Sequence, residues 1–351
     1  MPGRHAICGG LRPRILDHGD FPAAHRQLFG SRPPLRLQPG RKHGASARRR
    51  LVLQLPPKPE MEIRRILCPT DLSEASAHAV DQAVVLAAHY SARITALHVI
   101  NPLGLSMEGV GADRLGLRDE VAAFFEPATH AGIGVDVVLE CGQPARSILA
   151  RVSSLPADLI VMGTHGLSGF ERLMLGSVTE SVLRRSTVPV LTVPPRAHAT
   201  SRLPFARVLC AVDFSDASLD AVRFALSLAP DVAGGLTLLH VIEWPWDEPP
   251  SPAPGDLPAE QGAALAEFRR YLERTACARL QSLVPEASTS RVKPRLRNGK
   301  PYVQILDVAS QEKSDLIVVG VRGRNPLDLS FFGSTTNQVV RRATCPVLTV
   351  C

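Results

Sequence analysis

From residue 61 onward the chain alternates short apolar runs, rich in β-branched residues, with longer segments whose apolar positions recur at helical spacing. Such runs are typical of buried parallel strands, and the helices between them cover both faces of the sheet. The pattern predicts five strands in each of two stretches, with helices in between. The predicted strands lie near residues 63–68, 93–99, 134–140, 158–162 and 188–193, then near 206–212, 235–242, 291–297, 315–319 and 346–350.

The segment after the first predicted strand has the clearest helical pattern. Its apolar positions Ala75, Ala79, Ala83 and Leu86 fall on one face of a helix. Ser73 stands where a residue that caps the N-terminus of this helix is expected.

The two stretches are copies of one another. RRILCPTDLSEASAHAV at 64–80 matches ARVLCAVDFSDASLDAV at 206–222, and the closing RRSTVPVLTV matches RRATCPVLTV. The second copy is 15 residues longer, and much of the gain falls in EWPWDEPPSPAPGDLP at 243–258, where the density of proline predicts a surface loop. We therefore predict tandem domains at 61–195 and 205–351, joined by a linker at 196–204.

The third predicted strand of the second copy reads RVKPRLR and contains Pro294 and four basic residues. Proline and charge disfavour a central strand and suit an edge strand. A doubly wound parallel five-stranded sheet of order 3-2-1-4-5 satisfies this requirement in each copy. The order makes strands one and four neighbours, and ligands bind such sheets at the carboxyl ends of this pair.

A repeated glycine spacing, G-x-x-G-x9-G-[ST], follows the fourth strand of each copy. The first glycine permits a tight turn, the second lets backbone approach a ligand, and the Gly-Ser pair supplies bare backbone and a capping hydroxyl to a helix whose N-terminus favours phosphate. The predicted phosphate sites are Gly163, Gly166, Gly176, Ser177 and Thr179 with His165, and Gly320, Gly323, Gly333, Ser334 and Thr336 with Arg322.

Asp71 and Asp213 end the first strand of each copy. A carboxylate repels phosphate, so these side chains are expected to accept hydrogen bonds from a neutral sugar or base. Together with the phosphate cradle they describe a nucleotide site. The alternative is that the glycines are only turns and that Ser177 and Ser334 only cap helices.

With these motifs, residues 61–351 resemble a tandem universal stress protein. In that family G-x-x-G-x9-G-[ST] marks the ATP-binding subclass, and the fold is adenine-nucleotide α-hydrolase-like. The resemblance implies ATP in each copy, with Mg²⁺ or Mn²⁺ left open, and adds Val178 and Thr335 to the phosphate residues. It implies that the adenosine end is lined by Pro69, Thr70, Asp71 and Val99 in the first copy and by Ala211, Val212, Asp213 and Val241 in the second.

Two departures from the family pattern matter. Ala211-Val212 replaces Pro69-Thr70 and loses a hydroxyl, which predicts unequal affinity of the two copies. The long segment before residue 61 has no counterpart in the family.

The closing strands, VPVLTV and CPVLTV, are similar to those that family members pair between two domains. A tandem chain can form this pairing within itself, and covering an apolar edge is a sufficient physical reason. A homodimer is a further expectation, and the same residues would serve as core in either case.

The net charge of +7 is concentrated before residue 61. Residues 1–60 hold 12 Lys/Arg against 3 Asp/Glu, whereas the remaining chain holds 28 against 30. A nearly neutral body disfavours nucleic-acid binding. Nine prolines and seven glycines before residue 60 predict disorder. Met61 is expected to be the natural start, with the stretch before it a leader that is not part of the fold. A targeting peptide and an RNA-binding arm are the alternatives.

Seven scattered cysteines without a C-x-x-C pair are typical of reduced thiols, and no apolar run reaches the roughly 18 residues of a membrane span. A cytoplasmic protein is expected.

No P-loop, hydrolase elbow or H-E-x-x-H metal site is present, and His98 and His240 are expected to be structural. The leading hypothesis is a nucleotide-responsive stress module without dedicated catalysis. The rivals are a slow ATPase or phosphotransferase, and a protein-interaction module that binds no nucleotide.

Overall fold

The computed structural model describes residues 63–100, 110–164, 175–195, 197, 205–228, 235–243, 258–284, 291–321 and 333–351. Several predictions lie outside these residues. They are the disorder of 1–60, nearly all of the linker at 196–204, most of the proline-rich loop, and the loop positions His165, Gly166, Arg322 and Gly323.

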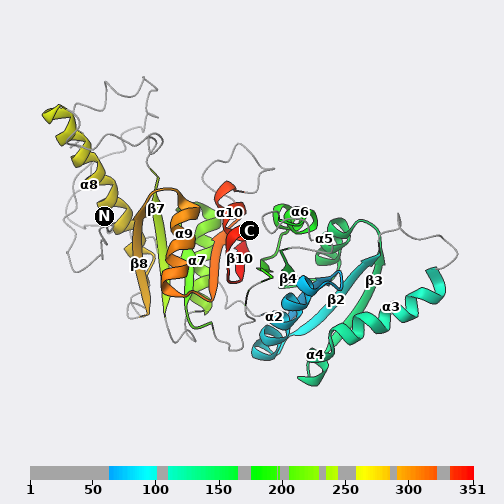
Figure 1. Cartoon of the computed structure of the whole chain (residues 1–351). Helices are drawn as coiled ribbons and strands as arrows, with labels where there is room; N and C mark the ends of the chain where they lie inside the picture. Colours follow the sequence, from blue (N-terminus) through cyan, green and yellow to red (C-terminus); the bar gives the residue numbers. More distant parts are fainter. Residues whose placement is uncertain are drawn as a thin grey trace, which may run out of the picture.

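Strands and helices alternate in both copies (Figure 1). The first copy contains β1 (Arg65–Thr70), α2 (Glu74–Tyr90), β2 (Arg93–Ile100), α3 (Val110–Phe124), α4 (Glu126–His130), β3 (Val135–Cys141), α5 (Pro144–Ser154), β4 (Leu159–Gly163), α6 (Ser177–Arg185) and β5 (Val190–Val193). The second contains β6 (Val208–Ala211), α7 (Asp216–Leu228), β7 (Leu236–Ile242), α8 (Ala259–Ser282), β8 (Val292–Asn298), α9 (Pro301–Glu312), β9 (Leu316–Gly320), α10 (Ser334–Arg342) and β10 (Val347–Val350).

The described strands form one ten-stranded sheet in the order β3-β2-β1-β4-β5-β10-β9-β6-β7-β8. Each half therefore has the predicted order 3-2-1-4-5. The prediction that strand three is an edge strand is confirmed, because β3 and β8 are the two outer strands and Pro294 lies in β8. Proline is tolerated there because an edge strand has one side without ladder partners.

The closing strands of the two copies pair with each other, as predicted. β5 and β10 are antiparallel, with Leu348 opposite Leu191, whereas the strand pairs within each half are parallel. Two buried hydroxyls reinforce this seam: Thr192 Oγ1 donates to the Val347 carbonyl oxygen and Thr349 Oγ1 to that of Val190, each at 3.1 Å. The chain thus covers the edge strand of each half with that of the other.

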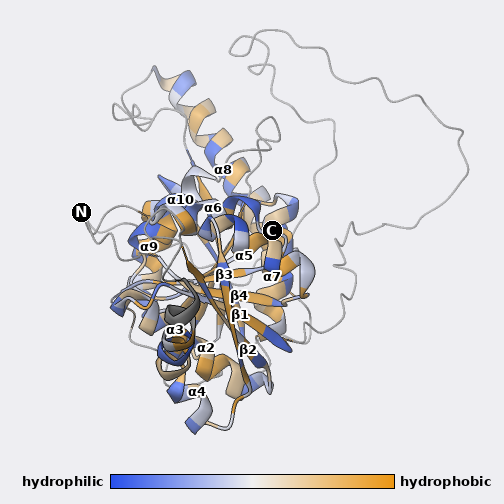
Figure 2. Ribbon diagram, turned by 90° about the vertical axis from the view of Figure 1, so that its right-hand side faces the viewer, coloured by the Kyte–Doolittle hydropathy of each residue, from blue (hydrophilic) through white to orange (hydrophobic). Residues whose placement is uncertain are grey.

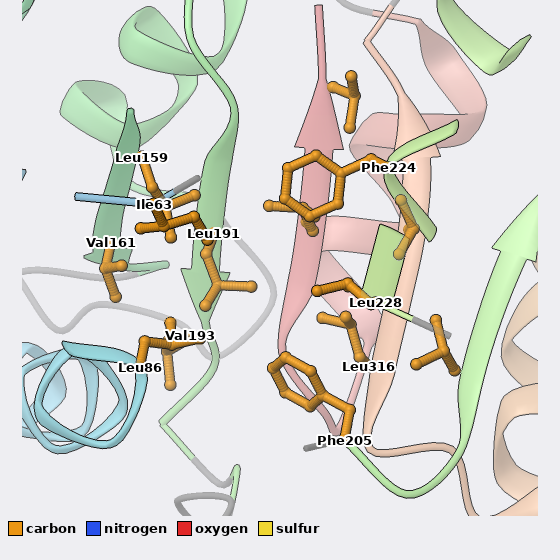
Figure 3. Packing of buried hydrophobic residues seen from close by; sticks show 14 of the residues in the cluster. Ile63, Leu86, Leu159, Val161, Leu191, Val193, Phe205, Phe224, Leu228 and Leu316 are labelled. Atoms are coloured by element: carbon orange, nitrogen blue, oxygen red, sulfur yellow. The ribbon is translucent and has the colours of Figure 1, made fainter. Parts of the chain in front are cut away.

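Apolar cores cover both faces of the sheet and continue across the seam. On one face α2, α3, α4, α7 and α8 contribute buried residues, and on the other face α5, α6, α9 and α10 do so. Figure 2 shows the corresponding apolar colouring of the sheet. In Figure 3 Leu191 and Leu159 of the first copy lie across the seam from Phe224 and Leu316 of the second. The two halves therefore share one hydrophobic interior.

An aspartate before the fourth strand anchors the first strand of each copy. Asp158 accepts hydrogen bonds from the backbone N–H groups of Arg64 and Arg65, both at 2.8 Å. Asp315 does the same for Ala206 and Arg207, at 2.6 and 2.9 Å. The repeated DLIV motif contains this aspartate, so the signal for this contact was present in the sequence.

The described helices include none that combines the length and apolar composition needed to cross a bilayer.

The described cysteines differ in bonding and burial. Cys277 is disulfide-bonded, contrary to the expectation of reduced thiols. Five described thiols are free, and Cys345 is intermediate in burial. Cys68 and Cys210 are fully buried, and burial raises the pKa of both thiols. Cys141 and Cys351 are exposed. A raised pKa leaves less thiolate at neutral pH, and thiolate is the form that reacts with alkylating reagents.

We therefore expect iodoacetamide to label Cys141 and Cys351 in the native chain and to spare Cys68 and Cys210 until the chain is unfolded. Peptide mass spectrometry with and without denaturant measures this difference. Rapid native labelling of Cys68 or Cys210 would contradict it.

Candidate functional site

The carboxyl ends of β1 and β4 are neighbours in the first copy, and those of β6 and β9 in the second. Thr70 is the last residue of β1 and Gly163 the last of β4. Asp71 follows directly, and Val99 lies near the carboxyl end of the next strand, β2. The described site residues that were predicted from the sequence therefore gather at this rim of the sheet in each copy.

The N-terminus of α2 lies at this rim, and nearby side chains cap it through hydrogen bonds. Ser73 is the N-cap, as predicted, and its Oγ accepts a hydrogen bond from Ser76 N. Asp71 Oδ1 in turn accepts hydrogen bonds from Ser73 N at 3.1 Å and from Ser73 Oγ at 2.5 Å. The carboxylate thus compensates the positive end of this helix.

The second copy repeats this arrangement around α7. Asp213 Oδ1 accepts from Ser215 N at 2.9 Å and from Ser215 Oγ at 2.5 Å, and Ser215 Oγ accepts from Ser218 N. In both copies the residue after the aspartate has a left-handed backbone, with φ 63° at Leu72 and φ 65° at Phe214. Such conformations are uncommon for bulky residues and indicate a tightly determined turn.

The second helix that begins at each rim has no such closure. The N-caps of α6 and α10 are Gly176 and Gly333, and neither helix has a side-chain hydrogen bond at its cap. The prediction that the hydroxyls of Ser177 and Ser334 cap these helices is therefore wrong. Each serine is the first residue of its helix, one position after the N-cap, and its side chain is exposed.

The glycine loops are closed at their base by the backbone. Gly176 N donates to the Thr164 carbonyl oxygen at 2.9 Å, and Gly333 N donates to that of Val321 at 3.2 Å. Thr164 N also bonds to Val193 in the last strand of its half, at 3.2 Å. The start of α6 and the start of α10 are thus fixed to the sheet, whatever path the intervening residues take.

Two predicted phosphate residues have hydroxyls with partners inside the fold. Thr179 Oγ1 donates to the Gly163 carbonyl oxygen at 2.9 Å, and Thr336 Oγ1 donates to that of Gly320 at 2.8 Å. Both threonine side chains are buried. Their hydroxyls hold the first turn of α6 or α10 against the end of the neighbouring strand.

The first glycine of each spacing ends a strand, and the turn expected after it leads into residues outside the described ones. Gly163 and Gly320 are the last residues of strands, and neither is among the described glycines with positive φ. At Gly320 a Cβ atom would lie 2.8 Å from the Ala217 carbonyl carbon and 2.9 Å from Ser218 N. Glycine is needed there because the first turn of α7 packs directly on the strand.

The Thr70 hydroxyl, which the second copy lacks, also has its hydrogen-bond partners inside the fold. Thr70 Oγ1 accepts from Leu72 N at 3.0 Å and lies 3.0 Å from Ser76 Oγ, and the side chain is buried. Val212 stands at this position in the second copy, with Ala211 before it in place of Pro69. Unequal affinity of the two copies stays a prediction, but this hydroxyl already has partners in the fold.

The histidines bond to the backbone of the first strand's end. His98 Nδ1 lies 2.9 Å from the Thr70 carbonyl oxygen, and His240 Nδ1 lies 2.6 Å from that of Val212. Because a carbonyl oxygen only accepts, Nδ1 carries the proton in both rings. This is a structural role, as expected.

The second copy contains a contact that the sequence did not indicate. The Arg279 guanidinium of α8 lies 4.1 Å from the Phe214 ring centroid, and Phe214 lies 4.6 Å from the His240 ring. The C-terminal end of α8 therefore contacts Phe214, the residue after Asp213. Leu72 occupies the position of Phe214 in the first copy, so this stack is specific to the second copy.

Comparisons with known proteins agree with this architecture. The profile described as "Universal stress protein family" matches residues 62–194 and 204–350. A universal stress protein of Mycolicibacterium smegmatis is 30% identical over 300 residues, covering 81% of this chain and 96% of that protein. One of Methanocaldococcus jannaschii is 33% identical over 138 residues, covering 37% of this chain and 81% of that protein. The crystal structure of an Archaeoglobus fulgidus universal stress protein superposes with a TM-score of 0.59 at 26% identity, over 82% of this chain and 98% of that one.

Proposed function

This chain belongs to the universal stress protein family, and we propose that it binds one adenine nucleotide at the β1–β4 rim of the first copy and one at the β6–β9 rim of the second. We propose further that binding regulates its contacts with other proteins. The nucleotide is ATP, with its phosphates at the start of α6 or α10 and its adenosine beside Asp71 or Asp213. The domain bounds 61–195 and 205–351 are part of the same proposal.

The observation that carries the proposal is the contrast between the two helix N-termini at each rim. The start of α2 is compensated by Asp71 and capped by Ser73, whereas the start of α6 has a glycine cap and an exposed serine. The first N–H groups of a helix have no partner within the helix, and together with the helix dipole they attract phosphate. Among the described residues, only the second of these two N-termini lacks a side-chain hydrogen bond at its cap.

The residues present suit a nucleotide in one further respect. Gly176 has no side chain to obstruct the approach of phosphate oxygens to the α6 backbone. The one acidic residue in the first turn of α6, Glu180, is paired with Arg184 at 2.9 Å.

A direct experiment tests the proposal. Isothermal calorimetry of the purified full chain with ATP, preceded by mass spectrometry of the small molecules released on denaturation, reports binding and retained nucleotide. We expect adenine nucleotide in the released fraction and heat of ATP binding by the emptied protein. No release and no binding heat would contradict the proposal, and steady release of ADP from the mixture would favour the rival ATPase.

Ser177→Pro is expected to weaken ATP binding to the first copy. The proline removes one backbone N–H at the first helical position, where proline is tolerated, and Gly176 before it has the compatible φ −59° and ψ 137°. Losing one hydrogen bond to a charged group costs about 1.5–3 kcal/mol, or about 10- to 100-fold in Kd. Calorimetry measures the change.

The matched control is Ser177→Ala, which removes the exposed hydroxyl and keeps the N–H. We expect this variant to bind much more tightly than Ser177→Pro. Equal affinities of the two variants would exclude the α6 backbone as the phosphate donor, although ATP could still bind elsewhere. Circular dichroism of both variants establishes that the helix is intact.

A further inference from the structure

The helix α8 extends well beyond the sheet that supports it (Figure 1). It contains 24 residues, and its C-terminal part packs on the body of the protein, where Ala276 and Leu280 are buried. Ala276 belongs to a small cluster with Ile242, the last residue of β7. The N-terminal part of the helix leads away from this contact.

The outer face of α8 is apolar as well as the inner one. Phe268 and Tyr271 are 41% and 46% exposed, which are large fractions for aromatic side chains. Ala264 and Ala278 are also exposed and fall on the same face by helical spacing. We refer to Ala264, Phe268, Tyr271 and Ala278 as the outer stripe.

One segment of the chain begins and ends beside this helix. The chain leaves β7 at Ile242, beside Ala276, and enters α8 after Pro258. These two points of α8 are separated by about 27 Å, at 1.5 Å of rise per residue. Residues 244–257 can span about 50 Å at most when fully extended, so they are long enough to reach along α8.

The composition of this segment matches the outer stripe. Residues 244–257 contain both tryptophans of the chain, Trp244 and Trp246, and three acidic residues without any basic one. Arg270 and Arg274 are exposed beside the stripe. A docked segment would bring tryptophan rings to the phenylalanine and tyrosine rings. Its carboxylates would face Arg270 and Arg274, which together outweigh the exposed Glu267 on the same side of the helix.

We propose that residues 244–257 dock on the outer stripe of α8, with Trp244 and Trp246 against Phe268 and Tyr271. Five prolines in this segment restrict its free conformations, which lowers the entropic cost of ordering it. Docking covers an apolar face that the described residues leave open. It also stiffens the helix whose base contacts Phe214 through Arg279.

Tryptophan fluorescence of the full chain tests this proposal, because both tryptophans lie in the segment. We expect emission at a shorter wavelength than that of the chain in denaturant, and weaker quenching by acrylamide. The double variant Phe268→Ala/Tyr271→Ala should lower the ratio of docked to undocked segment about fivefold or more and move the emission toward that of the unfolded chain.

Two further variants make the result specific. Leu115→Ala removes an even more exposed apolar side chain from α3 and should leave the emission unchanged. Asp247→Asn/Glu248→Gln alters only the segment, so it cannot unfold α8, and it should increase quenching. Native emission that matches the unfolded chain, or a double variant without effect, overturns the proposal. A blue shift that disappears on dilution, together with a dimer in light scattering, assigns the stripe to a second copy and overturns it equally.

Discussion

Replacing Gly320 by alanine is expected to lower the free energy of unfolding by about 2–3 kcal/mol. The added methyl group would lie 2.8 Å from the Ala217 carbonyl carbon, 2.9 Å from Ser218 N and 3.0 Å from the Ala217 carbonyl oxygen. These are backbone atoms in the first turn of α7, so the whole helix must move to relieve the contact. Chemical denaturation of the two proteins measures the loss as a lower midpoint at unchanged slope.

Gly116→Ala in α3 is the matched control for this substitution. Gly116 lies within α3, and a Cβ atom there would have no neighbour within 4 Å apart from the adjacent residues and the backbone of the helix itself. Alanine there should stabilise the chain by about 0.5–1 kcal/mol, because glycine is a poor helix former. If both substitutions shifted the midpoint in the same direction, the close approach of α7 would not be the reason for glycine at 320.

Leu191→Asp is expected to have the largest effect, a loss of about 4 kcal/mol or more in unfolding free energy. Leu191 is 2% exposed, lies opposite Leu348 in the β5–β10 pair and belongs to the core shared by both halves. The aspartate carboxylate would be buried there without a cation to pair with it. Removing the leucine side chain would also enlarge a small apolar cavity that already lies at the seam. Thermal unfolding followed by circular dichroism measures the loss.

The same substitution at an exposed leucine separates this effect from the chemistry of aspartate. Leu115 is 71% exposed on α3, and Leu115→Asp should cost less than about 1 kcal/mol. Similar losses at both positions would show that the seam contributes little to the stability of the chain.

The topology could be predicted from the sequence because each step depended on local signals. The repeat identified two equivalent units, the alternation of apolar runs and helices indicated a parallel sheet, and Pro294 assigned strand three to an edge. The apolar closing strands then needed cover, and each copy supplies it to the other. Ser73 could be assigned as a cap because its spacing to the following helix is a local property.

The wrong prediction concerns a one-residue difference, and the features that the sequence did not indicate are contacts between distant segments. Whether Gly176 or Ser177 caps α6 depends on where the first helical turn begins, and the sequence around it permits both. The reason for Gly320 is the approach of α7, more than a hundred residues earlier in the chain. The stack of Arg279, Phe214 and His240 likewise joins α8, the turn before α7 and β7, and no local sequence pattern predicts it. The nucleotide-binding residues themselves stay a prediction.

The antiparallel pairing at the seam has a consequence for where the two predicted sites lie. All other described strand pairs are parallel, so the strands of one copy end at the edge of the sheet where those of the other begin. The β1–β4 rim and the β6–β9 rim therefore lie at opposite edges of the sheet. A single small ligand or one flat partner surface can contact the first rim or the second, but not both.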